Sequence, residues 1–191
     1  MIKKPNNWEG VQAASDRPKL PLGCYVCKIM GAVVEDSVHG QVLSVRFDIA
    51  EGDQMGFYYK DYSSNTLPEK KWGGKKNVYL PLDDGSEADE RTKSNFKAFL
   101  TAVEQSNAGY TWDWNEKSLV NKIVGVVMRN EEWDFLGKHG WKVRPFRFTA
   151  AENVRNGTAH CPKDKPLSSD AAEPTTPSAA YTQVDNSDLP F

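Results

Sequence analysis

The order in which strand-like and helix-like segments follow one another most restricts the fold of this chain. Residues 42–50 alternate between apolar and polar side chains, with Ser44, Arg46 and Asp48 on the polar face, which predicts a half-buried β-strand. Four other segments are typical of strands, and they span residues 23–34, 76–82, 123–128 and 141–149. A single helix-like segment separates the third strand from the fourth.

That helix is predicted to begin after Ser86 and to end near Asn107. Ser86 and Asp89 have the spacing of a capping box, and the acidic residues here suit the positive end of the helix dipole. The apolar residues recur at i, i+3, i+4 and i+7 as one buried stripe, and they are Phe96, Phe99, Leu100 and Val103. Because three strands, a helix and two strands follow in the order of the OB-fold, we predict a mainly β protein. It is a five-stranded OB-fold barrel with one helix between strands 3 and 4, followed by a disordered C-terminal tail.

Composition divides the chain into four parts. Residues 1–20 are polar and contain Pro5 and Pro18, which indicates an extended N-terminal arm. Residues 21–160 hold the predicted OB-fold domain, whose base we expect Trp112 and Trp114 to close. From residue 161 the large apolar side chains nearly vanish, so residues 161–184 are predicted to be a flexible linker. Residues 185–191 form a short acidic and apolar tip.

The C-terminal tip combines two carboxylates with an apolar Leu-Pro-Phe sequence. It resembles the C-terminal tip of bacterial single-stranded DNA-binding proteins, a short acidic run that ends in Pro-Phe, although Asn186 and Ser187 interrupt the acidic run here. In that family the tip docks enzymes of replication and repair. The resemblance implies that the residues that dock partners are Asp185, Asp188, Leu189, Pro190 and Phe191.

Parts of the body show a second resemblance. The stretches that carry it are Leu20–Ile29, Phe47–Gly52, Phe96–Asn107, and Leu119–Gly125 followed by Glu131-Glu132. They resemble small proteins coded by phages and mobile elements of Gram-positive bacteria, which are thought to be phage-type single-stranded DNA-binding proteins of OB-like fold. The resemblance covers about residues 20–155 and implies a fold and a broad role in replication, recombination or repair, but no particular site.

Two segments combine aromatic rings with cations where an OB-fold binds nucleic acid. Single strands need flat rings for their bases and Lys or Arg for their phosphates. OB-folds carry these on the face of strands 2 and 3 and on two of the loops. The first segment supplies Tyr58, Tyr59, Lys60, Tyr62, Lys70, Lys71, Trp72, Lys75 and Lys76. The second, around a predicted turn at 137–140, supplies Arg129, Trp133, Lys138, Trp141, Lys142 and Arg144, with His139 and Arg147 nearby. Adjacent strand residues face opposite ways, so Phe57 and one of Tyr58 or Tyr59 are expected to pack inside.

The charge distribution leaves room for this role. The chain has a net charge of −2, but five acids and two lysines lie beyond Cys161, so the rest of the chain is slightly basic. Two other functions stay open: a docking adaptor that uses only the tail, and a metal-dependent nuclease that uses the acids at 83–90. The position of these acids at a helix start already explains them, so no enzymatic activity is predicted.

Cysteines and hydropathy bound the remaining possibilities. Cys24 and Cys27 have the spacing of half a zinc site, and His160 and Cys161 could complete it, but Cys24 and Cys27 would point to opposite faces of a strand. No metal or cofactor is therefore predicted.

No apolar run reaches the roughly 20 residues of a membrane helix, and no signal peptide is evident. We expect a cytoplasmic protein, in the host cytoplasm if a phage encodes it. Its expected partners are single-stranded DNA and the enzymes that bind the tip. Assembly into homo-oligomers stays open, because strand edges and the arm could both serve it.

Overall fold

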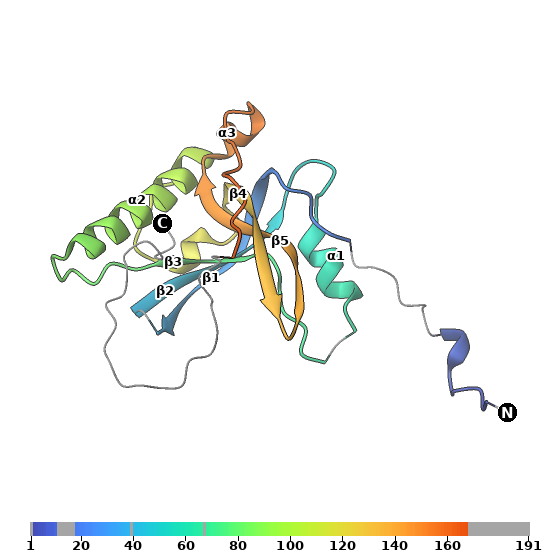
Figure 1. Cartoon of the computed structure of the whole chain (residues 1–191). Coiled ribbons are helices and arrows are strands. Elements are labelled where there is room, and N and C mark those ends of the chain that lie inside the picture. The colour runs from blue at the N-terminus through green and yellow to red at the C-terminus, as the bar shows by residue number, and fades with distance from the viewer. Residues whose placement is uncertain (1, 11–17, 39, 67, 168–191) are drawn as a thin grey trace, which may run out of the picture.

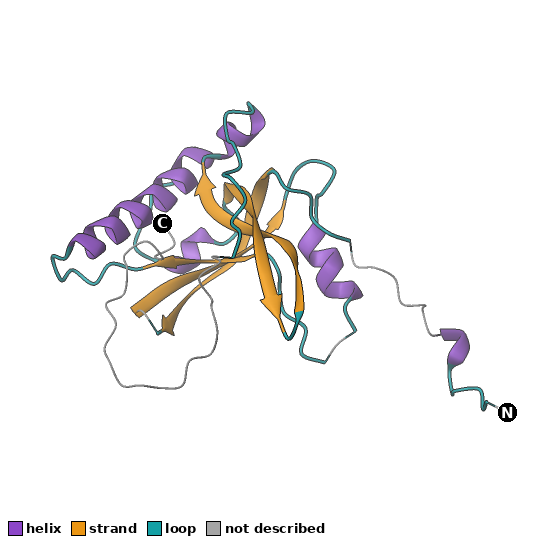
Figure 2. Cartoon of the chain, in the orientation of Figure 1, coloured by secondary structure: helices purple, strands orange, loops and turns teal. Residues whose placement is uncertain are grey.

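A computed structural model describes residues 2–10, 18–38, 40–66 and 68–167 of the chain (Figure 1). The strands are β1 (Cys24–Ser37), β2 (Gly40–Ile49), β3 (Lys75–Tyr79), β4 (Ile123–Phe135) and β5 (Lys138–Thr149). The helices are α1 (Phe57–Ser64), α2 (Glu87–Ser106) and α3 (Ala151–Arg155), with 3₁₀ turns η1 (Trp8–Gly10) and η2 (Glu116–Leu119) (Figure 2). The predicted mainly β protein with a long helix between the third and fourth strands is confirmed.

The five strands form one antiparallel sheet in the order β3-β2-β1-β4-β5. The long strand β1 is shared, because its first residues pair with β4 and its later residues pair with β2. Cys27 belongs to both ladders and lies opposite Ile49 and Val124. Within the described ranges no ladder joins the two edge strands β3 and β5, so the sheet is open and closure into a barrel is not shown.

Helix α2 covers one side of the sheet and completes the core (Figure 1). Its predicted N-cap is confirmed, since the backbone N–H of Asp89 donates to Ser86 Oγ at 3.1 Å. Phe96, Phe99 and Val103 are buried as expected and Leu100 is half-buried, and the rings of Phe99 and Phe148 lie 4.7 Å apart between helix and sheet. At the other end, Asn107 hydrogen-bonds both backbone groups of Ile123 at 2.8 and 2.9 Å, which ties the helix to the start of β4.

Strand β5 is an edge strand that contains a bulge. The register shifts between Val127 and Met128 of β4, where Pro145 enters the pairing and Phe146 is left without a partner. Pro lacks the N–H that a central strand needs, so the edge or bulge predicted at Pro145 is confirmed. The hairpin is longer than expected, and its turn lies at Leu136 and Gly137 rather than at 137–140.

Two polar positions of β2 differ from the alternation that the sequence suggests. Ser44 and Asp48 are buried, and only Arg46 faces solvent as predicted. The prediction that β2 is buried on one face only is therefore wrong, because α1 packs over its second face near Asp48. Neither α1 nor α3 was predicted, and α1 includes Tyr58 and Tyr59, which were expected to be adjacent residues of a strand.

Residues after 160 begin the C-terminal tail differently from the expectation of a flexible linker that starts at 161. Lys165 forms a parallel bridge with Glu131, with hydrogen bonds of 2.9 Å to the backbone of Asn130 and Glu132. The reason is that β4 continues beyond Val127, which pairs with the first residue of β1, and presents unpaired backbone groups there. The rest of the linker and the whole tip, 168–191, lie outside the described residues. In the ranges given above, no helix is both long and apolar enough to cross a membrane.

Candidate nucleic-acid interface

Helix α1 owes its position to a carboxylate on the neighbouring strand. Asp48 accepts hydrogen bonds from the backbone N–H groups of Ile49, Tyr58 and Tyr59 at 2.8, 3.0 and 3.0 Å. A negative charge at a helix N-terminus satisfies free N–H groups and suits the helix dipole. Gly56, the N-cap residue of α1, makes no side-chain capping hydrogen bond, so Asp48 of β2 supplies the capping acceptor.

The two adjacent tyrosines of α1 have different environments. Tyr58 is only 6% exposed and packs edge-on against Phe47, with ring centroids 5.8 Å apart. Burial raises the pKa of its hydroxyl. Tyr58 is therefore a core residue, and its assignment to the binding surface is corrected. Tyr59 is 64% exposed and can offer its ring to a base.

Tyr62, Lys70 and Trp72 form a group that we call the Trp72 cluster. The indole Nε1 of Trp72 donates to the carbonyl oxygens of Phe47 and Gly74 at 3.0 and 3.2 Å, which fixes the ring. The Tyr62 ring lies 5.7 Å from it, and the Lys70 ammonium lies 4.5 Å from the Tyr62 ring centroid. Gly74 permits this arrangement, since an added Cβ would lie 2.2 Å from the carbonyl oxygen of Phe47. Two half-buried rings and a cation are thus held in place before any ligand arrives.

Of the remaining cations in this segment, Lys71 is exposed and has no ion pair within the part of the chain that the structure describes. Lys60 donates to the Met55 carbonyl at 2.9 Å. Lys75 pairs with Glu35 at 2.9 Å, and this hydrogen bond lowers the pKa of Glu35. Lys75 is consequently less available to a phosphate than Lys71.

The β4–β5 hairpin carries the second predicted group. Trp133 pairs with Gly140 across the hairpin, and a Cβ added to Gly140 would lie 3.3 Å from the indole. Trp141 stays exposed, as do Lys138 and Lys142. Phe135 and Leu136 are also exposed at the turn, and the sequence analysis missed both because it placed the turn one residue too late.

Arg129 is held by Glu131 of the same strand and by Phe146 of the neighbouring strand β5. Its guanidinium lies 4.4 Å from the Phe146 ring centroid, and its Nε donates to Glu131 at 3.0 Å. Glu131 also lies 3.7 Å from the more exposed Arg144. Of these two predicted phosphate contacts, Arg144 has the freer guanidinium.

Lys76 brings the two groups into one electrostatic environment. It is half-buried at the start of β3, and this burial lowers its pKa. Glu131 opposes that shift and Arg129 reinforces it, so both β4 side chains are close enough to act on the Lys76 ammonium. Lys76 therefore lies near the Glu131 and Arg129 part of β4, and β3 also approaches β5 of the same hairpin.

The chemistry set aside on sequence grounds has structural explanations. Cys27 lies in the core, whereas Cys24 and Cys161 approach to 3.8 Å between sulfur atoms. Asp89 accepts from the backbone N–H of Leu82 at 2.7 Å and pairs with Lys93 at 3.2 Å. Residues 2–10, 18–38, 40–66 and 68–167 contain no group of three or more His, Cys, Asp or Glu placed to hold a metal.

Comparisons with known proteins add no assignment. The chain matches no known protein-family profile and no curated protein sequence.

Proposed function

We propose that this protein binds single-stranded DNA, with little sequence preference, across α1, the Trp72 cluster and the β4–β5 hairpin. The fold proposed for it is an OB-fold barrel that is open between β3 and β5. The strand order β3-β2-β1-β4-β5 supports this proposal, as does the position of α2 between the third and fourth strands.

The Trp72 cluster is the observation that carries the proposal. Stacking on an aromatic ring contributes about 1–3 kcal/mol per base and tolerates any sequence, since every base has a flat face. A ring fixed by two hydrogen bonds loses little entropy on stacking. Lys70 and Lys71 lie beside it to meet phosphates, and Lys138, Lys142 and Arg144 extend the positive charge along the hairpin.

The biological role follows from this binding. The protein would coat single strands exposed in phage-type replication, recombination or repair and protect them from nucleases and hairpins. The tip residues Asp185, Asp188, Leu189, Pro190 and Phe191 would recruit the enzymes of those processes. A tether raises the effective concentration of a recruited enzyme at the strand, even when the tip itself binds weakly.

A fluorescence titration tests the DNA-binding part. The intact protein is titrated with oligo-dT and with a duplex of equal length, at two salt concentrations. We expect tryptophan quenching by the single strand that weakens at high salt, and a much weaker response to duplex. No response to the single strand at either salt concentration would refute DNA binding and favour an adaptor that uses only its tail.

Removal of residues 185–191 tests the division of labour. The shortened protein should bind oligo-dT as well as the full chain or slightly better, because the acidic tip no longer competes with phosphates. Clear weakening would contradict a tip reserved for partners.

A further inference from the structure

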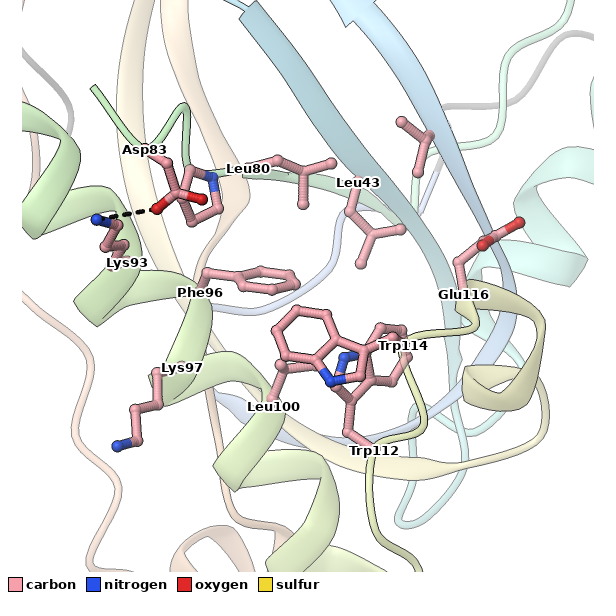
Figure 3. A pocket seen from close by; sticks show the side chains of 12 residues that line it. Leu43, Leu80, Asp83, Lys93, Phe96, Lys97, Leu100, Trp112, Trp114 and Glu116 are labelled. Carbon is pink, nitrogen blue, oxygen red and sulfur yellow. Dashed lines mark ion pairs between the residues drawn. The ribbon is translucent and has the colours of Figure 1, made fainter. Parts of the chain in front are cut away.

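A second aromatic feature lies on the other side of the molecule. An apolar pocket of about 630 Å³ opens between α2 and the segment that precedes η2 (Figure 3). Its apolar lining is contributed by Leu43, Leu80, Phe96, Leu100, Trp112 and Trp114. Figure 1 shows α2 and α1 on opposite sides of the sheet, so this pocket is separate from the Trp72 cluster.

The two tryptophans of the pocket are unusual. Trp114 has a φ of 62°, which a bulky residue rarely adopts, and its side chain is 79% exposed. Such strain persists mainly where function requires it. Its neighbour Trp112, 6.3 Å away between ring centroids, has a buried Nε1 with no acceptor among the described residues. The expectation that Trp114 closes the barrel base is thus wrong, and its exposed ring is available to pack against an occupant of the pocket.

The rim of the pocket indicates the charge of that occupant. Residues 83–93, at the start of α2, carry five carboxylates and two cations. Lys93 is already engaged, with Asp83, Asp89 and Glu90 at 3.0, 3.2 and 3.0 Å. The charged side chains that line the pocket itself are balanced, with Asp83 and Glu116 against Lys93 and Lys97, so the negative excess lies beside the pocket at the start of α2. An apolar side chain with a cation that reaches this helix start matches the arrangement better than an acidic segment does.

The N-terminal arm has these properties. Its turn η1 buries no residue, and Trp8 is 56% exposed. Lys4 pairs with Glu9, whereas Lys3 has no ion pair in the ranges that the structure describes. A three-residue turn is not stable alone, and Trp8 is the aromatic side chain that this turn leaves exposed.

The pocket that fits Trp8 belongs to another molecule. The arm and α2 lie on opposite sides of the sheet in Figure 1. The twelve residues from Trp8 to the buried Leu20 span at most about 40 Å when extended. A domain of this size has a radius of gyration of about 15 Å, so a path around it to the far side is longer than the arm.

We infer that the arm of one copy docks on the next copy, with Trp8 in the pocket beside Trp114 and Lys3 near the acidic start of α2. One tryptophan buries about 150–250 Å², so the contact is weak between free molecules. Copies on the same strand are held at high effective concentration, and there the contact makes binding cooperative. This consequence rests on the proposed function, whereas the docking itself does not.

Crosslinking tests the docking without DNA. A photoreactive benzoylphenylalanine replaces Trp8 in the otherwise complete chain, and ¹⁴N- and ¹⁵N-labelled copies are mixed at high protein concentration before irradiation. We expect crosslinks of mixed isotope between position 8 and peptides that contain Phe96 or Trp114. Crosslinks of uniform isotope alone, with no mixed species, would assign the pocket to the molecule's own arm and overturn the inference. Crosslinks elsewhere, or none, would also overturn it. The same result is expected even if the protein fails to bind DNA, so the two proposals can fail separately.

Binding to long and short strands tests the consequence. Trp8→Ala and Trp114→Ala should each lower the apparent affinity for long poly(dT) by about tenfold or more, the loss typical of a residue that dominates a contact. Affinity for an oligonucleotide that holds one copy should stay unchanged. Ile2→Ala is the matched control, because Ile2 is an exposed apolar arm residue outside the contact. Equal losses on both lengths would refute cooperative docking.

Discussion

The Trp72 cluster and the Trp112–Trp114 pocket use the same kinds of side chain in opposite settings. The Trp72 indole has two acceptors, and Lys70 lies close by, whereas Trp112 lacks an acceptor within the described part of the chain and lies near an acidic helix start. One setting suits a polyanion whose bases stack, and the other suits an apolar, cationic peptide. The charge and polar groups around an exposed ring, more than the ring itself, indicate its ligand.

Removal of the Asp48 carboxylate, which caps α1, should disturb the side of the molecule that carries α1 and leave the pocket side unchanged. Asp48→Ala leaves three backbone N–H groups without their acceptor, and unsatisfied buried donors cost about 1–3 kcal/mol each, partly relieved by water. We expect a loss of about 3 kcal/mol in the free energy of unfolding, measured by urea denaturation.

The matched control for Asp48→Ala is Asp53→Ala, an exposed aspartate in the loop that follows β2. It should change the free energy of unfolding by less than about 0.5 kcal/mol. Quenching by oligo-dT should weaken in Asp48→Ala, because Tyr59 lies on the helix that Asp48 caps. Equal stability of the two variants would show that Asp48 does not hold α1.

Removal of one aromatic ring from each region, in separate variants, sharpens the comparison. Trp72→Ala should lower the affinity for a short oligo-dT by about tenfold to a hundredfold, since one stacked base is lost. Trp114→Ala should leave that affinity unchanged. Fluorescence anisotropy of a labelled oligonucleotide measures both.

Trp72 also supports the fold through its hydrogen bonds, so a second variant guards the interpretation. Tyr59→Ala removes an exposed ring and should weaken binding without a change in unfolding. If Trp114→Ala weakened binding to the short oligonucleotide as much as Tyr59→Ala, the separation of the two regions would be wrong.

Sequence patterns predicted what depends on neighbours along the chain. The stripe of α2, its cap at Ser86 and the irregularity at Pro145 all follow from local spacing, and the structure has each of them. The expectation that one of Tyr58 and Tyr59 packs inside is also met, but on a helix and not on the strand from which it was argued. Only the packing of α1 on β2 decides that it is Tyr58.

The residues that sequence reasoning missed depend on distant contacts. Asp48 looks like the polar face of a strand, and its role appears only when residues ten positions away return to it. The bridge from Lys165 to β4 likewise requires that β4 continue beyond the residues that pair with β1. Asp113 and Glu116 lie near Trp114 in the sequence, but the acidic start of α2 comes close to it only in the fold.

Charge changes test the electrostatic half of the comparison. Lys70→Ala and Lys71→Ala should each reduce the slope of log affinity against log salt by about 1, if each lysine meets one phosphate. Lys97→Ala, which removes a cation from the pocket lining, should leave the slope as it is. Titrations with oligo-dT at four or more salt concentrations give the slopes. A lower slope for Lys97→Ala would place DNA on the pocket side as well.

The smallest effect concerns the protonation of Lys76. Its pKa is lowered from 10.5 because burial disfavours the charged ammonium, so this lysine loses its proton at a lower pH than exposed lysines do. Between its lowered pKa and 10.5 the unfolded chain binds more protons than the folded one, so Lys76 makes stability rise with pH there. DNA affinity should change in the opposite direction, because a neutral amine no longer attracts phosphate. We therefore expect affinity for a short oligo-dT to fall as the pH rises through that window. In Lys76→Arg the fall should be smaller, because a guanidinium stays charged. Lys97→Arg, on the pocket side, should follow the unmodified protein. Identical pH profiles for all three proteins would remove Lys76 from the interface and leave the Trp72 cluster and the hairpin as separate surfaces.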